Sequence, residues 1–209
     1  MKRRDLLLSL ALMAAAAPAF AAGDALPPPL SDEDRALVDK AAAYLDGLGQ
    51  VRGRFTQTDP RGTTSQGVLY LNRPGKARFE YEGPAQRLVV SDGHTVVVYD
   101  GRLKTFNRYP LGATPLALFL QRHVRLDQKV VVDRVDRSAE GFTIVAHDGR
   151  HESRGRINLT FSDSPVELKA WSILDAQGGR TEVRLSNLEP TSGLDPALFQ
   201  LQNPNRATP

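Results

Sequence analysis

Side chains that could carry out catalysis or bind a metal are few in this sequence. There is no cysteine, which excludes disulfides, thiolate zinc ligands and cysteine nucleophiles. The sequence also lacks a glycine-rich phosphate loop, a Gly-x-Ser-x-Gly elbow and a His-Glu-x-x-His zinc motif. We therefore expect no enzyme activity, no catalytic residues, no cofactor and no metal.

One group of polar residues could be part of a hydrolase site. Ser91, Asp92 and His94 lie within four positions of one another. However, Asp92-Gly93 is a strong hairpin signal, and turn geometry alone explains both residues. We therefore interpret this segment as a turn between two strands.

The spacing of two histidines raises the question of a metal site. His147 and His151 would share one face of a helix, where both could bind the same ion. The residues between them, Asp148-Gly149-Arg150, predict a hairpin turn instead. We interpret both histidines as solvated loop residues.

Composition and charge narrow the function classes further. Of the 209 residues, 24% are charged and 41% are hydrophobic, which is typical of a globular protein. The net charge is only +3, and the arginines are scattered rather than gathered in a basic stripe. We therefore expect no nucleic-acid partner. The length and the lack of internal repeats favour a single domain, residues 22–209, which we expect to be a monomer.

The first 21 residues are typical of a cleaved secretory signal peptide. Lys2, Arg3 and Arg4 precede an apolar run at residues 6–17, and small residues stand where cleavage after Ala21 would require them. The run is shorter than the roughly 20 residues that span a bilayer. We expect an exported, soluble periplasmic protein whose mature chain keeps 24 basic and 23 acidic residues.

The mature chain begins with one long helix. Residues 22–30 contain three consecutive prolines and predict an extended leader. Ser31 and Asp34 form a helix-capping pattern. Apolar residues then recur at helical spacing, and they are Leu37, Val38, Ala41, Leu45 and Leu48.

From residue 51 the hydrophobic period changes from 3.6 to 2, which predicts strands. The predicted strands are 51–56, 67–71, 77–82, 87–91, 95–99, 103–106, 130–135, 142–146, 156–161, 166–174 and 181–188. A short apolar helix after Thr114 interrupts the series, and residues 196–201 form a short closing element. The pattern predicts a mainly β (α+β) fold with about ten to eleven antiparallel strands in a barrel or strongly curled sheet.

Two of these strands are apolar on both faces. Val89-Val90 and the segment 96–99 do not alternate with polar residues, as a sheet with one face in water would. One face needs a core, and the other needs a second cover or a ligand. The long helix could supply that cover in an ordinary α+β core.

A series of motifs follows the first helix in a fixed order. The motifs are Phe55-Thr56-Gln57, the run from Gly67 to Tyr81 with Arg73-Pro74-Gly75, then Pro84, Val90-Ser91-Asp92-Gly93, Val98-Tyr99-Asp100 and Thr114-Pro115-Leu116. This order resembles the LolA family of outer-membrane lipoprotein carriers. The resemblance is specific from residue 55 to residue 120 and looser afterwards. The receptor LolB shares this fold but is anchored through a cysteine, which this chain lacks.

The resemblance implies an incomplete antiparallel β-barrel with a helical lid over a hydrophobic cavity that binds acyl chains. It implies that Arg73, followed by Pro74, holds the lid. The implied lid residues are Leu116, Phe119 and Leu120, with Leu45 and Leu48 of the first helix as further candidates. The implied partners are outer-membrane lipoproteins, an inner-membrane ABC transporter that releases them, and LolB where that receptor is present.

Alternation along the strands suggests which side chains line the cavity. The candidates are Phe55, Leu69, Phe79, Tyr81, Leu88, Val90, Val97, Tyr99 and Trp171. A register error of one residue would turn a strand's whole set to the other face. Two alternatives remain open at this point. The chain could bind another lipid or amphiphile in the same half-barrel, or it could be a structural domain with a filled core.

Overall fold

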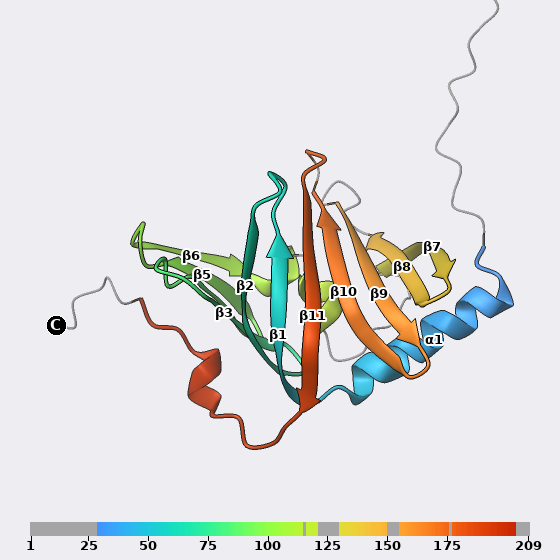
Figure 1. The fold of residues 1–209 in the computed structure, drawn as a ribbon, viewed down its shortest axis with the longest axis horizontal. Helices are drawn as coiled ribbons and strands as arrows, with labels where there is room; N and C mark the ends of the chain where they lie inside the picture. The colour runs from blue at the N-terminus through green and yellow to red at the C-terminus, as the bar shows by residue number, and fades with distance from the viewer. Residues whose placement is uncertain (1–28, 115, 121–129, 150–154, 176, 204–209) are drawn as a thin grey trace, which may run out of the picture.

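A computed structural model describes residues 29–114, 116–120, 130–149, 155–175 and 177–203 (Figure 1). The predicted signal peptide, most of the leader, Pro115 and His151 lie outside these residues. The helices are α1 (Asp32–Gly47), η1 (Leu111–Ala113), α2 (Leu116–Leu120) and η3 (Pro196–Phe199). The strands are β1 (Gln50–Thr58), β2 (Thr64–Asn72), β3 (Lys76–Tyr81), β4 (Leu88–Asp92), β5 (Thr95–Asp100), β6 (Thr105–Pro110), β7 (Val130–Ser138), β8 (Gly141–Asp148), β9 (Arg156–Asp163), β10 (Val166–Leu174) and β11 (Arg180–Pro190).

The capping pattern at Ser31 starts α1 where the sequence predicts it. The Ser31 side chain accepts a hydrogen bond of 3.1 Å from the backbone N–H of Asp34. The buried stripe is Val38, Ala41 and Leu45, and α1 packs it against the sheet at β7 and β10. Within the described part of the chain, no helix is long and apolar enough to cross a membrane.

The eleven strands form one antiparallel sheet that does not close. Their order is β6-β5-β4-β3-β2-β1-β11-β10-β9-β8-β7, so β6 and β7 are the two edges. The first and last strands are neighbours in the middle of the sheet, because β1 pairs with β11. This arrangement confirms the predicted incomplete antiparallel barrel of ten to eleven strands.

Irregularities in the strands help the sheet to curl. Register shifts interrupt β1, β7 and β10, and such bulges bend a strand and increase its twist. Gly67 in β2 allows a particularly close approach, because a Cβ there would lie 2.0 Å from the backbone oxygen of Glu80 in β3. Any side chain at Gly67 would therefore force β2 and β3 apart.

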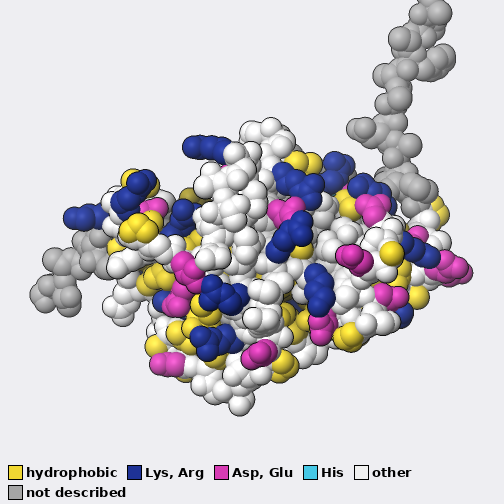
Figure 2. Space-filling view, in the orientation of Figure 1, with side chains coloured by type: hydrophobic (Ala, Val, Ile, Leu, Met, Phe, Trp, Pro, Cys, Tyr) yellow, Lys and Arg dark blue, Asp and Glu magenta, His cyan; other side chains and the backbone are white. Residues whose placement is uncertain are grey.

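The concave face of the sheet encloses the hydrophobic interior, which we define as the buried apolar cluster shared by the sheet, α1 and α2. In Figure 1, α2 lies behind the central strands β1, β2 and β11. Both halves of the sheet contribute to the interior, the first through Val51, Phe55, Leu69, Leu71, Ala77, Phe79 and Val96 and the second through Val130, Phe142, Ile144, Ile157, Leu159, Phe161, Leu168, Trp171 and Val183. The view in Figure 2 shows mixed positive and negative side chains on the opposite, convex face.

The C-terminal segment covers part of the convex face. Phe199 of η3 is 1% exposed, and η3 packs on β3 and β4. Arg78 of β3 fastens it by donating a hydrogen bond of 3.0 Å from Nη1 to the backbone oxygen of Leu198. This segment, and not the long helix, is therefore the second cover of the strands that are apolar on both faces.

Candidate functional site

The short helix α2 closes over the hydrophobic interior. Phe119 and Leu120 are almost fully buried, with 1% and 0% exposure, and Leu116 is half-buried against the same cluster. The ring of Phe119 stacks on that of Trp171, with centroids 5.3 Å apart and an angle of 24° between the planes. A helix of five residues has little stability of its own, so these side-chain contacts hold α2 in place.

A series of aromatic rings continues from α2 across the sheet. Trp171 meets Phe79 edge to face at 6.0 Å, and Phe79 meets Phe55 in the same way at 5.3 Å. Phe55 then meets Tyr81 at 4.9 Å. Edge-to-face pairs of this kind add about 0.5–1.5 kcal/mol each beyond the burial of their area. The interior beneath α2 is therefore a continuous apolar and aromatic surface.

Tyr81 ends this series with a polar contact. Its hydroxyl donates a hydrogen bond of 2.7 Å to Oε1 of Gln57. Burial raises the pKa of Tyr81 from its ordinary value of 10.0 to about 12, and the nearby positive charge of Arg87 opposes that rise. The neutral phenol is therefore the form that the fold stabilises.

We expect this raised pKa to appear in the alkaline stability of the protein. Because the pKa is higher in the folded state, the stabilisation is complete below pH 10 and is lost as the pH rises to about 12. A shift of about two units corresponds to about 2–3 kcal/mol. Denaturant unfolding of the wild type and of Tyr81→Phe across this range measures the effect. The wild type should lose this much more stability than the variant, and parallel pH profiles would contradict the assignment.

A turn between β2 and β3 fastens the end of α2. The backbone N–H of Gly75 donates a hydrogen bond of 2.7 Å to the carbonyl oxygen of Leu120, the last residue of α2. Ser91 Oγ in turn donates a hydrogen bond of 2.7 Å to the oxygen of Gly75. Gly75 has a φ of +82°, and a Cβ there would lie 2.8 Å from Cα of Gly93. Glycine is thus required at position 75, where the turn contacts α2.

Arg73 occupies the same turn. Its backbone N–H donates a hydrogen bond of 3.1 Å to the oxygen of Gly49, which joins the turn to the segment between α1 and β1. The side chain is half-buried, whereas Pro74 is exposed. Burial lowers the pKa of Arg73, and the carboxylate of Asp46 opposes that shift. Arg73 is therefore a cation held partly out of water beside the point where α2 is fastened.

The sequence of this half-barrel protein matches one family of known proteins and several of its members. The family model described as outer membrane lipoprotein carrier protein LolA matches residues 46–202. The chain belongs to the LolA family. The outer-membrane lipoprotein carrier protein of Chromohalobacter salexigens is 28% identical over 181 residues, covering 81% of this chain and 84% of the relative. That of Methylococcus capsulatus is 29% identical over 171 residues, covering 78% and 81%.

Solved structures share the fold of this LolA-family chain at much lower identity. A protein of the DUF1329 family from Desulfovibrio piger superposes with a TM-score of 0.50 at 13% identity, covering 81% of this chain and 98% of the other. At that identity the similarity concerns the fold alone.

For this LolA-family chain, part of the predicted cavity set faces the interior. Phe55, Leu69, Phe79 and Trp171 are each at most 4% exposed and belong to the interior cluster, while Tyr81 is partly buried against it. Phe119, Leu120 and Leu116 of the predicted lid lie against the same cluster, as do Leu45 and Leu48 of the α1 region. Whether these residues contact acyl chains remains a prediction.

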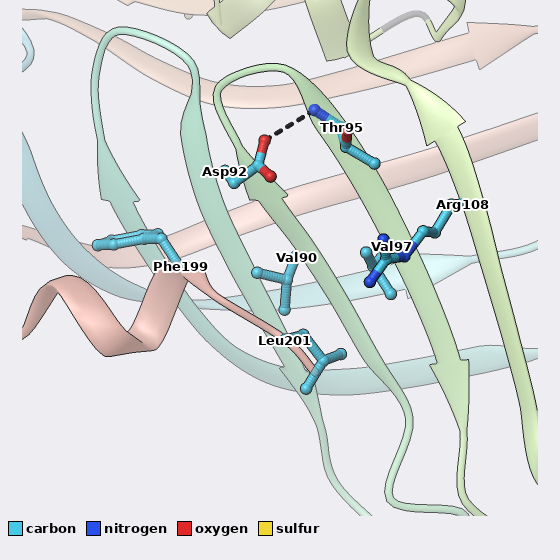
Figure 3. A pocket seen from close by; sticks show the side chains of 7 residues that line it. All are labelled: Val90, Asp92, Thr95, Val97, Arg108, Phe199 and Leu201. Atoms are coloured by element: carbon cyan, nitrogen blue, oxygen red, sulfur yellow. Dashed lines mark hydrogen bonds between the residues drawn. The ribbon is translucent and has the colours of Figure 1, made fainter. Parts of the chain in front are cut away.

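The predicted direction is wrong for β4 and β5. Val90 and Val97 lie on the convex face, where they line a small pocket of about 70 Å³ together with Phe199, Leu201 and Arg108, and with Asp92 and Thr95 at its polar side (Figure 3). Leu88 and Tyr99 alternate with them and share that face. The reason is the C-terminal cover, which makes both faces of this hairpin apolar and removes the period-two signal.

The residues that replace them on the inner side are Val89, Val96 and Val98. Alternation alone could not find these residues, because each has a valine on the opposite face. Phe142, Ile144, Ile157 and Phe161 in β8 and β9 were also missed. Apolar residues alternate with polar ones along much of these strands, but the motifs of the resemblance lie between residues 55 and 120.

Asp92 and His147, which the sequence offered as parts of a hydrolase site and a metal site, make hydrogen bonds within the fold. Asp92 Oδ1 accepts hydrogen bonds of 2.8 Å from the backbone N–H groups of His94 and Thr95, which is turn geometry. The prediction that His147 is a solvated loop residue is wrong, because it lies in β8 with 5% exposure. Its Nδ1 is 2.9 Å from Oδ1 of Asp133. Among the described residues, no three His, Asp or Glu side chains come together as a metal site.

Proposed function

We propose that this chain is a periplasmic carrier that binds the acyl chains of lipoproteins in its hydrophobic interior. In this proposal, an inner-membrane ABC transporter releases the lipoproteins to it, and it delivers them to the outer membrane, through LolB where that receptor is present. Membership of the family and the naming of its relatives as outer-membrane lipoprotein carrier proteins support the proposal. The observation that carries it is the apolar interior beneath the short helix α2.

The energetics of lipid transfer fit such an arrangement. Each methylene group of an acyl chain costs about 0.8 kcal/mol to expose to water, so a lipoprotein cannot cross an aqueous compartment unaided. A carrier offers apolar contacts and must also release its cargo. Because Phe119 occupies the surface of Trp171, acyl chains that bind there would displace α2 and replace its contacts. Lid closure would then drive release, since closing restores the ring stacking.

In the same proposal, Arg73 biases the lid toward release. A partly buried cation beside the end of α2 disfavours long residence of apolar chains nearby. A hydrogen bond from this cation to a carbonyl of the lid would contribute about 1.5–3 kcal/mol. The bias is strong enough to favour one lid position but too weak to lock it.

Replacement of Arg73 with leucine should impair hand-over of cargo. The variant keeps the fold, but an apolar group replaces the cation, and we expect transfer to acceptor membranes to slow roughly tenfold or more. Transfer of a labelled lipoprotein from the loaded carrier measures the effect. Arg52→Leu, at an exposed position on the convex face, is the matched control and should transfer normally. Normal transfer by the Arg73 variant would remove this role.

Depletion of the protein in cells tests the function as a whole. Lipoproteins destined for the outer membrane should accumulate at the inner membrane, and the purified protein should carry a bound lipoprotein. If the purified protein instead carries free lipid or a glycolipid and lipoprotein sorting is unchanged, the half-barrel serves another amphiphile.

A further inference from the structure

The turn between β5 and β6 projects an apolar side chain between two cations. Leu103 is 62% exposed, the most exposed large hydrophobic residue among those described, and Arg102 and Lys104 on either side of it are also exposed. We call these three residues the β5–β6 tip. Figure 2 shows Lys and Arg side chains beside hydrophobic side chains at the end of the molecule where Figure 1 places this turn. An isolated exposed leucine needs no explanation, but one enclosed by cations at the end of a hairpin is unusual.

The tip is held in shape by its own acidic residue. Asp100 Oδ1 accepts hydrogen bonds from the backbone N–H groups of Arg102, at 3.0 Å, and Leu103, at 2.9 Å. The carboxylate is thus directed into the turn, while the cations and Leu103 project outward. The neighbouring loop supports the base, because the N–H of Gly101 donates a hydrogen bond of 2.8 Å to the oxygen of Ala85. Leu103 therefore stays exposed on an ordered turn.

Two other turns at the same end of the sheet follow the same scheme. The antiparallel order places the β1–β2 and β10–β11 turns at that end. Asp59 and Asp175 accept backbone N–H groups within those turns, and Arg61 and Arg180 are exposed beside them. Arg61 and Arg180 thus add exposed positive side chains at that end of the sheet, although Arg180 also lies 3.4 Å from the carboxylate of Glu182.

We propose that the β5–β6 tip docks on the surface of a membrane that contains anionic phospholipid. Arg102 and Lys104 would contact the phosphate groups, and Leu103 would enter the boundary of the acyl region between them. Leu103 favours a lipid surface over an acidic protein, because it is a large apolar side chain that lies 62% exposed between the two cations. Membrane docking goes beyond the proposed transport of lipoproteins. It would bring β6, one free edge of the half-barrel, next to the bilayer.

Binding to vesicles in the absence of any lipoprotein tests the proposal. The protein should sediment with vesicles of phosphatidylglycerol and phosphatidylcholine but not with phosphatidylcholine alone, and added salt should weaken the binding. The double variant Arg102→Gln/Lys104→Gln should bind roughly 30-fold more weakly. The control Lys169→Gln/Arg184→Gln removes the same charge from exposed positions on β10 and β11 and should bind like the wild type.

The apolar contribution needs its own pair of variants. Leu103→Gln should weaken binding about tenfold, whereas Tyr109→Gln, at an exposed position near the other end of β6, should not. Circular dichroism confirms that each variant is folded. Equal binding to both kinds of vesicle, or equal losses in the two double variants, would overturn the proposal. So would tip variants that keep vesicle binding but lose cargo transfer, since the tip would then contact an acidic protein. A protein that binds vesicles but carries no lipoprotein would refute the proposed function alone.

Discussion

Trp171→Ala should lower the free energy of unfolding by about 3–5 kcal/mol. The side chain is 3% exposed and contacts Phe119 of α2 as well as Phe79 of β3. In the sheet it pairs with Leu159 and Val183 of the second half, whereas Phe79 belongs to the first half, so the cavity left by alanine would open between the two halves of the sheet. Rigid strands on both sides prevent collapse into that space, which places the cost at the upper end of such substitutions.

Denaturant unfolding followed by circular dichroism measures this loss. Leu174→Ala, three residues further along β10, is the control, because that leucine is 38% exposed. It should cost less than about 1 kcal/mol. A Trp171 variant that is as stable as the Leu174 variant would mean that α2 and β3 repack without the indole ring.

The sheet could be predicted from the sequence because its strands carry strong local signals. Polar and apolar residues alternate in β1, β3 and β9, and Asp-Gly pairs mark the β4–β5 and β5–β6 turns. Ser31 and Asp34 likewise mark the start of α1. These features depend on neighbours in the sequence, which makes them visible before any contact is known.

The direction of β4 and β5 could not be predicted, because it depends on a distant segment. Val90 and Val97 are covered by Phe199, about a hundred residues further along the chain. A strand that is covered on both faces has no polar positions to set its register. The two-sided pattern did predict a second cover, but nothing in it identified the C-terminal segment.

The contacts that hold the end of α2 also could not be predicted from the sequence. The resemblance implies that Arg73 holds the lid, which stays a prediction, and Arg73 lies two residues before the glycine that binds the end of α2. The backbone hydrogen bond from Gly75 to Leu120 and the close approach of Gly75 to Gly93 depend on three-dimensional structure. The sequence predicts a turn at Gly93, whereas Gly75 enters only as part of the Arg73-Pro74-Gly75 motif.

Phe119→Ala should loosen the lid, whereas Phe199→Ala should not, although both remove a phenylalanine that is 1% exposed. Each substitution should destabilise the fold by about 3–5 kcal/mol. The difference lies in position, because Phe119 stacks on Trp171 inside the half-barrel and Phe199 packs on the convex face. Without Phe119, α2 keeps Leu120 and Leu116 but loses the ring stacking on Trp171, so water or an apolar ligand gains access to the indole.

Trp171 is the single tryptophan of the chain, so its fluorescence reports on the interior beneath α2. The emission of Phe119→Ala should shift to the red, and the variant should bind an apolar dye more tightly than the wild type does. Phe199→Ala should match the wild type in both measurements while it is folded. A red shift in both variants would show general loosening of the core. An unchanged emission in Phe119→Ala would show that α2 does not shield the interior, and the lid would then have to lie elsewhere in the chain.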